Sequence, residues 1–82
     1  MYTTYILFSQ KSKKFYTGQC QDIETRLAQH NNGRNLSTRA GAPWKLVFAQ
    51  SFESRSQAVA FEHKIKKRGA ARFLSDNHLT VG

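Results

Sequence analysis

Residues 2–18 of this chain read Tyr-Thr-Thr-Tyr-Ile-Leu-Phe-Ser-Gln-Lys-Ser-Lys-Lys-Phe-Tyr-Thr-Gly, and this stretch decides the fold. Aromatic and β-branched residues, which favour strands, fill both of its ends. The polar segment 9–14 between them has the composition of a turn. The pattern predicts an antiparallel hairpin of strands 1–8 and 15–18. Gly18, at the end of the hairpin, permits a close backbone approach that a larger residue would block.

A first helix is expected directly after the hairpin. Asp22 is a favoured N-cap residue, and Ile23, Leu27 and His30 then follow at the i, i+4, i+7 spacing of one helical face. The Asn-Asn-Gly run at 31–33 is a strong helix stop, because these residues accept the left-handed conformation found at helix C-termini.

A third strand follows a basic, polar segment, 34–43, that shows no helical pattern. Residues 44–52 alternate apolar and polar side chains, and this alternation predicts a strand. Ser54 and Gln57 then match a capping box, which predicts a helix over 55–68. Gly69 is the natural end of that helix.

Residues 70–77 are expected to form a short last helix whose apolar side chains pack back onto the domain. The order is therefore β-β-α-β-α-(α). This order predicts a small mixed α/β domain of the α+β type, in which helices flank a central antiparallel three-stranded sheet. Repeats, linkers and low-complexity segments are lacking in the sequence, so residues 1–82 are interpreted as one domain with a core at about 2–74.

Composition narrows the class of protein. Thirteen Lys and Arg stand against five Asp and Glu in 82 residues, which gives a net charge of +8. A small folded domain with this charge most often binds a polyanion, usually nucleic acid. Cys20 is the only cysteine, so an intrachain disulfide and a cysteine zinc site are excluded. The sequence shows neither a membrane span nor a signal peptide, and a cytoplasmic location is expected.

Glu62 is the most informative residue. Ala58, Phe61 and Ile65 form the apolar stripe of the predicted 55–68 helix, and Glu62 falls inside that stripe. A carboxylate on a core-facing side is costly unless it is paired or binds a cation. Two interpretations stay open: a metal ligand, or an edge residue that pairs with Lys66 at i+4 or with an Arg across the fold.

Three further side chains could take part in phosphate chemistry. Arg26 and His30 lie at i and i+4, and a guanidinium beside an imidazole suits a phosphate. A solvated Arg beside a half-buried His is the structural alternative. Tyr5 and Tyr16, one on each hairpin strand, could place hydroxyls beside a phosphate oxygen, although tyrosines more often pack with the hydroxyl at the rim.

Taken together, these residues resemble the GIY-YIG nuclease domain, in particular its stand-alone bacterial members. The matching segments are Tyr5-Ile6-Leu7, Phe15-Tyr16-Thr17-Gly18, 22–31 with Gly33, 52–58 and 61–67. Two departures stand out. The first triplet, Thr3-Thr4-Tyr5, keeps only its Tyr, and Asn77, the only late Asn, does not map onto the Asn of some larger members.

The resemblance implies metal-dependent hydrolysis of DNA phosphodiesters, with a link to DNA repair or recombination. Glu62 would hold Mg²⁺ or Mn²⁺, Arg26 would steady the scissile phosphate, and Tyr5 or Tyr16 with His30 would activate water. A small-molecule cofactor is not expected. One carboxylate is enough for Mg²⁺, which keeps several waters and borrows phosphate oxygens. Weak metal affinity without DNA is therefore expected.

The remaining cations are candidate phosphate contacts or plain solvated surface. They are Arg34, Arg39, Lys45, Lys64, Lys66 and Lys67. Because the sequence contains no base-reading helix, recognition of backbone or DNA shape is expected, with added specificity from a protein partner. Two alternatives stay open: a non-catalytic nucleic-acid-binding module that keeps the fold, and a protein-interaction domain whose charge is incidental.

Overall fold

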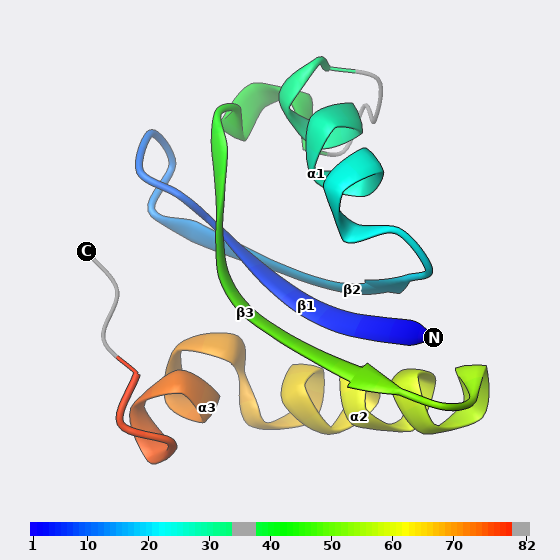
Figure 1. The fold of residues 1–82 in the computed structure, drawn as a ribbon. Helices are drawn as coiled ribbons and strands as arrows, with labels where there is room; N and C mark the ends of the chain where they lie inside the picture. Colours follow the sequence, from blue (N-terminus) through cyan, green and yellow to red (C-terminus); the bar gives the residue numbers. More distant parts are fainter. Residues whose placement is uncertain (34–37, 80–82) are drawn as a thin grey trace.

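A three-stranded antiparallel sheet forms the centre of the computed structural model, which describes residues 1–33 and 38–79. Strand β1 (Tyr2–Ser9) lies in the middle, between β2 (Lys14–Cys20) and β3 (Trp44–Phe52). Figure 1 shows this arrangement, with the β1–β2 hairpin at one end. The predicted hairpin is confirmed, and β2 runs two residues further than the sequence pattern indicated.

Helices cover both faces of the sheet. Helix α1 (Ile23–Asn31) lies on one side, whereas α2 (Arg55–Arg68) and α3 (Ala70–Asp76) lie on the other (Figure 1). The element order and the α+β class therefore match the prediction. The segment expected to lack helix contains one short 3₁₀ turn, η1 (Arg39–Gly41), which is too short to produce a helical pattern in the sequence.

Strand β1 is buried on both faces, and its side chains alternate between two cores. On the α1 side, Tyr5 and Leu7 pack with Cys20 and Trp44. On the opposite side, Ile6 packs under α2 and α3. The core on that side is built from Ile6, Ile65 and Leu74, with Phe15, Val47, Phe48, Phe61, Ala70 and Phe73 around them.

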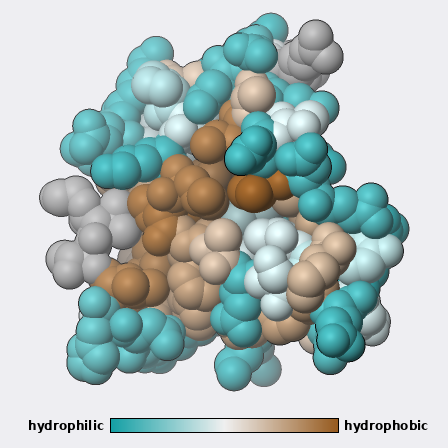
Figure 2. Space-filling view, in the orientation of Figure 1, coloured by the Kyte–Doolittle hydropathy of each residue, from teal (hydrophilic) through white to brown (hydrophobic). Residues whose placement is uncertain are grey.

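Aromatic rings fill much of the α2–α3 side. The ring centre of Phe73 lies 5.2 Å from that of Phe48 and 5.6 Å from that of Phe61, both in edge-on geometry. Phe61 also contacts Phe52, at 5.3 Å. Such pairs add to the free energy of area burial. Figure 2 shows hydrophobic surface over the middle of the β3 side, where half-buried residues of β3 lie.

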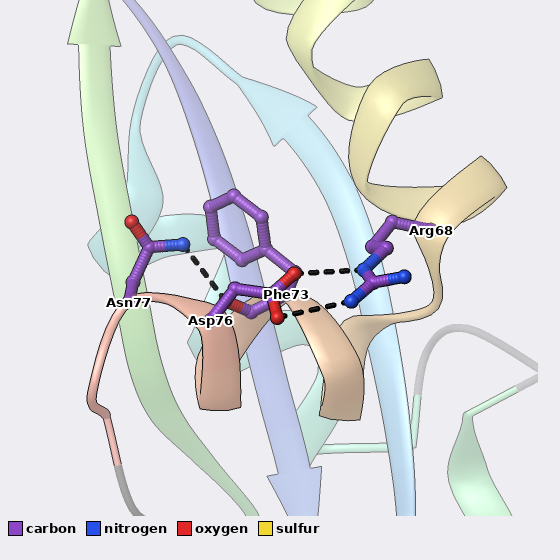
Figure 3. A network of polar contacts seen from close by, with 4 residues as sticks. All are labelled: Arg68, Phe73, Asp76 and Asn77. Carbon is purple, nitrogen blue, oxygen red and sulfur yellow. Dashed lines mark hydrogen bonds and ion pairs between the residues drawn. The ribbon is translucent and has the colours of Figure 1, made fainter.

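Local signals fix both ends of α2 and its corner with α3. The capping box of Ser54 and Gln57 is present at the start of α2, as predicted. The helix ends before Gly69, which has a φ of 95° that a residue with a side chain would disfavour. Arg68 then reaches across the corner. It donates two hydrogen bonds to the Asp76 carboxylate, at 2.7 and 3.0 Å (Figure 3).

Helix α1 is held at both of its ends. Asp22 accepts a hydrogen bond from the Thr25 backbone N–H, which confirms the predicted N-cap. At the other end, the Asn31 amide donates to the Trp44 carbonyl and accepts from the Trp44 backbone N–H. This pair of bonds joins the end of α1 to the start of β3. Across the part of the chain that the structure describes, no helix has the length and apolar character needed to cross a membrane.

Candidate active site on the α1 face of the sheet

The site begins with a close contact between Tyr5 and Gly18. These residues face each other across the β1–β2 pair. A Cβ atom on Gly18 would lie 2.7 Å from the Tyr5 hydroxyl oxygen and 3.3 Å from the Tyr16 ring. Glycine therefore leaves the space in which the Tyr5 hydroxyl lies, and this is the close approach that the sequence predicted for Gly18.

His30 connects the Tyr5 hydroxyl to the start of η1. Its Nε2 lies 3.3 Å from the Tyr5 hydroxyl oxygen, and its Nδ1 lies 2.7 Å from Thr38 Oγ1. All three residues are at most 2% exposed. The Trp44 indole N–H donates to the Thr38 carbonyl, which fixes the loop from the other side. Both ring nitrogens of His30 thus have buried partners, which set the orientation of the imidazole.

Arg26 and His30 differ in exposure although they lie one turn apart. Arg26 is exposed, whereas His30 is buried. Burial lowers the pKa of His30 below its ordinary value, and the nearby Arg26 charge lowers it further. His30 is therefore neutral near pH 7. The expected shared face holds only in part, because solvent reaches the guanidinium and not the imidazole.

Tyr16 is the more accessible of the two tyrosines. Its ring centre lies 4.8 Å from that of His30 and 6.3 Å from that of Tyr5. Tyr16 is half-buried, whereas Tyr5 is 2% exposed. A water molecule can therefore approach the site beside Tyr16 more readily than beside Tyr5.

The Tyr5 hydroxyl holds its proton firmly. Burial raises its pKa well above the usual value, electrostatic interactions with Tyr16, Cys20 and the Glu62 carboxylate raise it further, and Arg26 opposes them. This direction is opposite to the lowering that activation of water by Tyr5 would need. Tyr16, Arg26 and Glu62 therefore all influence this one hydroxyl electrostatically.

Glu62 forms an ion pair within its own helix. Its Oε2 lies 2.7 Å from Lys66 Nζ, and the side chains of Glu62 and Lys66 are 15% and 55% exposed. The alternative pairing with Lys66 is therefore present, together with the electrostatic influence of Glu62 on Tyr5. An i, i+4 pair with a half-exposed lysine contributes little, so the carboxylate can exchange its partner.

Glu62 is a sparse donor set for a metal. Within residues 1–33 and 38–79, no cluster of three or more His, Cys, Asp or Glu side chains could hold an ion. One carboxylate still fits Mg²⁺ or Mn²⁺, since Mg²⁺ keeps most of its waters and shares oxygens with a phosphate. These residues therefore fit an ion that binds together with its substrate.

The candidate DNA-binding cations differ in their surroundings. Arg39, Lys45, Lys64 and Lys67 are exposed, and Lys66 is paired with Glu62. Arg34 lies outside the described residues. Thr38 is the site residue that sequence reasoning missed. It lies in a segment without periodicity, so only the fold reveals its contact with His30.

The comparison with known proteins shows the family of this chain. The chain matches the GIY-YIG catalytic domain over residues 1–74 and belongs to that family.

Its relatives include the UPF0213 proteins. A UPF0213 protein of Streptococcus pneumoniae serotype 4 is 39% identical over 67 residues, which cover 77% of this chain and 68% of that protein. The solution NMR structure of a UPF0213 protein from Bacillus halodurans has a TM-score of 0.55 and 27% identity. That match covers 92% of this chain and 81% of the other.

A more distant homologue has a described activity. The structure-specific endonuclease subunit SLX1 of Kluyveromyces lactis is 36% identical over 88 aligned residues. The match covers 98% of this chain and 31% of that protein, so this chain corresponds to less than a third of the yeast subunit.

Proposed function

We propose that this protein is a metal-dependent DNA endonuclease that hydrolyses phosphodiester bonds with little sequence preference. One observation supports this proposal most: the Tyr5 hydroxyl of β1 lies beside His30 of α1 and beside Tyr16 and Gly18 of β2. The Tyr5 hydroxyl lies 3.3 Å from His30 Nε2 and within the electrostatic influence of Tyr16, Arg26 and Glu62. The catalytic-domain family and the endonuclease homologue support the same reaction class.

Each side chain in the proposed site has a role that follows from its surroundings. Exposed Arg26 would bind the scissile phosphate with a fixed charge and a two-pronged fork. Half-buried Tyr16 would orient the attacking water. Tyr5, which keeps its proton, would donate a hydrogen bond, while neutral His30 would position Tyr5 from behind.

Glu62 would hold the divalent ion after it releases Lys66. A bound ion there would stabilise negative charge on the phosphate and the leaving oxygen. The released Lys66 would remain beside Tyr16 as a phosphate contact, because both residues line the same hollow. A structure-directed substrate is part of the proposal, since the homologue is a structure-specific endonuclease subunit.

A second candidate function is a non-catalytic DNA-binding module. The Glu62–Lys66 ion pair favours it, because this pair occupies the carboxylate that would hold the ion. Such a module would bind DNA in EDTA and cleave none with any metal.

Cleavage by a Glu62→Gln variant tests the proposal. Nicked plasmid and branched DNA would be incubated with Mg²⁺ or Mn²⁺, with Glu53→Gln, an exposed acid outside the site, as the matched control. We expect wild type and Glu53→Gln to cleave the DNA at similar rates. The cleavage rate of Glu62→Gln should be lower by about 100-fold or more, in line with the several kcal/mol of transition-state stabilisation that a metal contributes. Equal cleavage by all three proteins would refute the role of Glu62. An absence of cleavage by the wild type would refute the nuclease proposal and favour the non-catalytic DNA-binding module.

A further inference from the structure

Two hollows flank the tyrosine pair along the edge strand β2. One, of about 590 Å³, is lined by Phe15, Tyr16 and Thr17 together with the α2–α3 corner. The other, of about 220 Å³, is lined by residues 19–22 together with the start of α1. Gly18, which lies against the Tyr5 hydroxyl, separates the two stretches of β2. The proposed site therefore shares residues with both hollows, Tyr16 with the larger and Arg26 with the smaller.

Two arginines from different helices converge on the smaller hollow. Arg26 comes from α1 and Arg55 is the first residue of α2, and both are exposed. The Arg55 guanidinium also lies 5.6 Å from the centre of the Tyr2 ring, which stabilises its position. Asp22 is the carboxylate in this lining, and its two oxygens accept hydrogen bonds from Thr25. The excess charge is positive, as a phosphate requires.

The larger hollow also carries more cations than carboxylates. Arg68 is engaged by Asp76 (Figure 3), and Lys66 is engaged by Glu62. Arg72 lines the same hollow, is exposed, and makes no ion pair within 4 Å among the described residues. Its charge still helps to lower the pKa of Asp76. Arg72 is thus the cation on this side that is available to an incoming anion.

We propose that the two hollows are subsites for successive phosphates of one DNA strand that runs along β2, with Arg55 and Arg72 as its outer contacts. This inference rests on the proposed function, because it takes the scissile phosphate to lie at Arg26. Tyr16 and Cys20 are four residues apart, or roughly 13 Å along a strand. That length exceeds one phosphate-to-phosphate step of a DNA strand, so each hollow can take a different phosphate of the same strand.

The opposite edge of the sheet has a different surface. Strand β3 carries half-buried apolar residues, and hydrophobic surface gathers on this side of the molecule (Figure 2). Its exposed cation is Lys45, and the neighbouring turn η1 carries exposed Arg39. These two residues mark the alternative path for DNA, whereas Lys11 and Lys13 of the β1–β2 turn, which are exposed and line neither hollow, are the matched controls.

Equilibrium binding tests the proposal separately from cleavage. The full chain would be titrated in EDTA into a short fluorescein-labelled DNA duplex at several salt concentrations. We expect Arg55→Gln and Arg72→Gln each to weaken binding about threefold to tenfold and to reduce the salt slope by about one. Lys11→Gln and Lys13→Gln should bind within about twofold of wild type. Thermal melting would establish that each variant is folded.

Two results would overturn the proposal. One is wild-type affinity for Arg55→Gln and Arg72→Gln while Lys45→Gln and Arg39→Gln lose affinity, which would move the DNA to the other edge. The other is an absence of DNA binding by the wild type at low salt. Failure of the nuclease proposal gives another result. In that case the protein would still bind DNA through Arg55 and Arg72 in EDTA, but it would cleave no DNA with any metal.

Discussion

The two faces of the sheet are built from different chemistry. On the α1 face, Tyr5, Tyr16, His30 and Thr38 combine aromatic packing with hydroxyl and imidazole groups that bond to one another. On the α2–α3 face, the core consists of aliphatic residues and phenylalanines. Since β1 serves both faces, one strand alternates between a polar site and an apolar core.

This difference separates stability from reactivity. The apolar face stabilises the fold through the apolar area that it buries, and this stabilisation does not depend on directional contacts between particular groups. The polar face needs each group at a defined distance, because a buried hydroxyl or imidazole without its partner is costly. Damage to either face should therefore lower stability, but only damage to the α1 face, or to Glu62 of α2, should alter the chemistry of the folded protein.

The same deletion on each face gives the largest expected effect on stability. Leu7→Ala removes a fully buried side chain next to Tyr16, and Leu74→Ala removes one from the opposite core. Each should lower the free energy of unfolding by about 2–5 kcal/mol, measured by urea denaturation. Cleavage per folded molecule should fall for Leu7→Ala and stay within about twofold of wild type for Leu74→Ala.

Milder variants keep this comparison measurable if either deletion unfolds the domain. Leu7→Met and Leu74→Met conserve volume and should cost less than about 1.5 kcal/mol each. Equal losses of activity from the two faces, at full folding, would contradict the separation of roles.

Acid sensitivity gives a smaller effect. His30 has a lowered pKa because it is buried and lies near Arg26, and it also faces Tyr5, Tyr16 and Thr38. The unfolded chain therefore binds a proton more readily than the native protein. The contribution of the buried, neutral His30 to the free energy of unfolding is complete above pH about 6.5 and is lost as the pH falls below that value.

Urea denaturation between pH 7.5 and 5 would measure this contribution. His30→Gln should show a shallower loss of stability than wild type over that range, whereas His63→Gln, which changes an exposed residue of α2, should follow wild type. A loss of stability by His30→Gln as steep as that of the wild type would contradict a role for His30 in the acid sensitivity.

Most of the fold could be predicted from the sequence because its signals are local. Alternation gave β3, the capping box at Ser54 and Gln57 gave the start of α2, and Gly69 gave its end. The turn η1 could not be predicted, since three residues carry no periodicity. The partition of β1 between two cores also needed the assembled sheet.

The candidate site was predictable in its residues more than in its geometry. Helical spacing and strand position singled out Tyr5, Tyr16, Arg26, His30 and Glu62 as candidates, and the family resemblance gave each an expected role. Sequence spacing alone could not give the burial of His30, its bond to Thr38 or the raised pKa of Tyr5, because each depends on residues distant in the chain. The i, i+4 spacing did anticipate the Glu62–Lys66 pair.

The most direct test of the account compares two tyrosines. Single-turnover cleavage would be measured for Tyr16→Phe, which removes only the hydroxyl of the proposed site. Tyr2→Phe removes the same group from a half-buried residue of β1 that packs under Arg55 and serves as control. We expect Tyr16→Phe to lose about 100-fold or more in rate with unchanged DNA affinity, and Tyr2→Phe to cleave like wild type. Equal rates for the two variants would contradict a reaction centred on the α1 face.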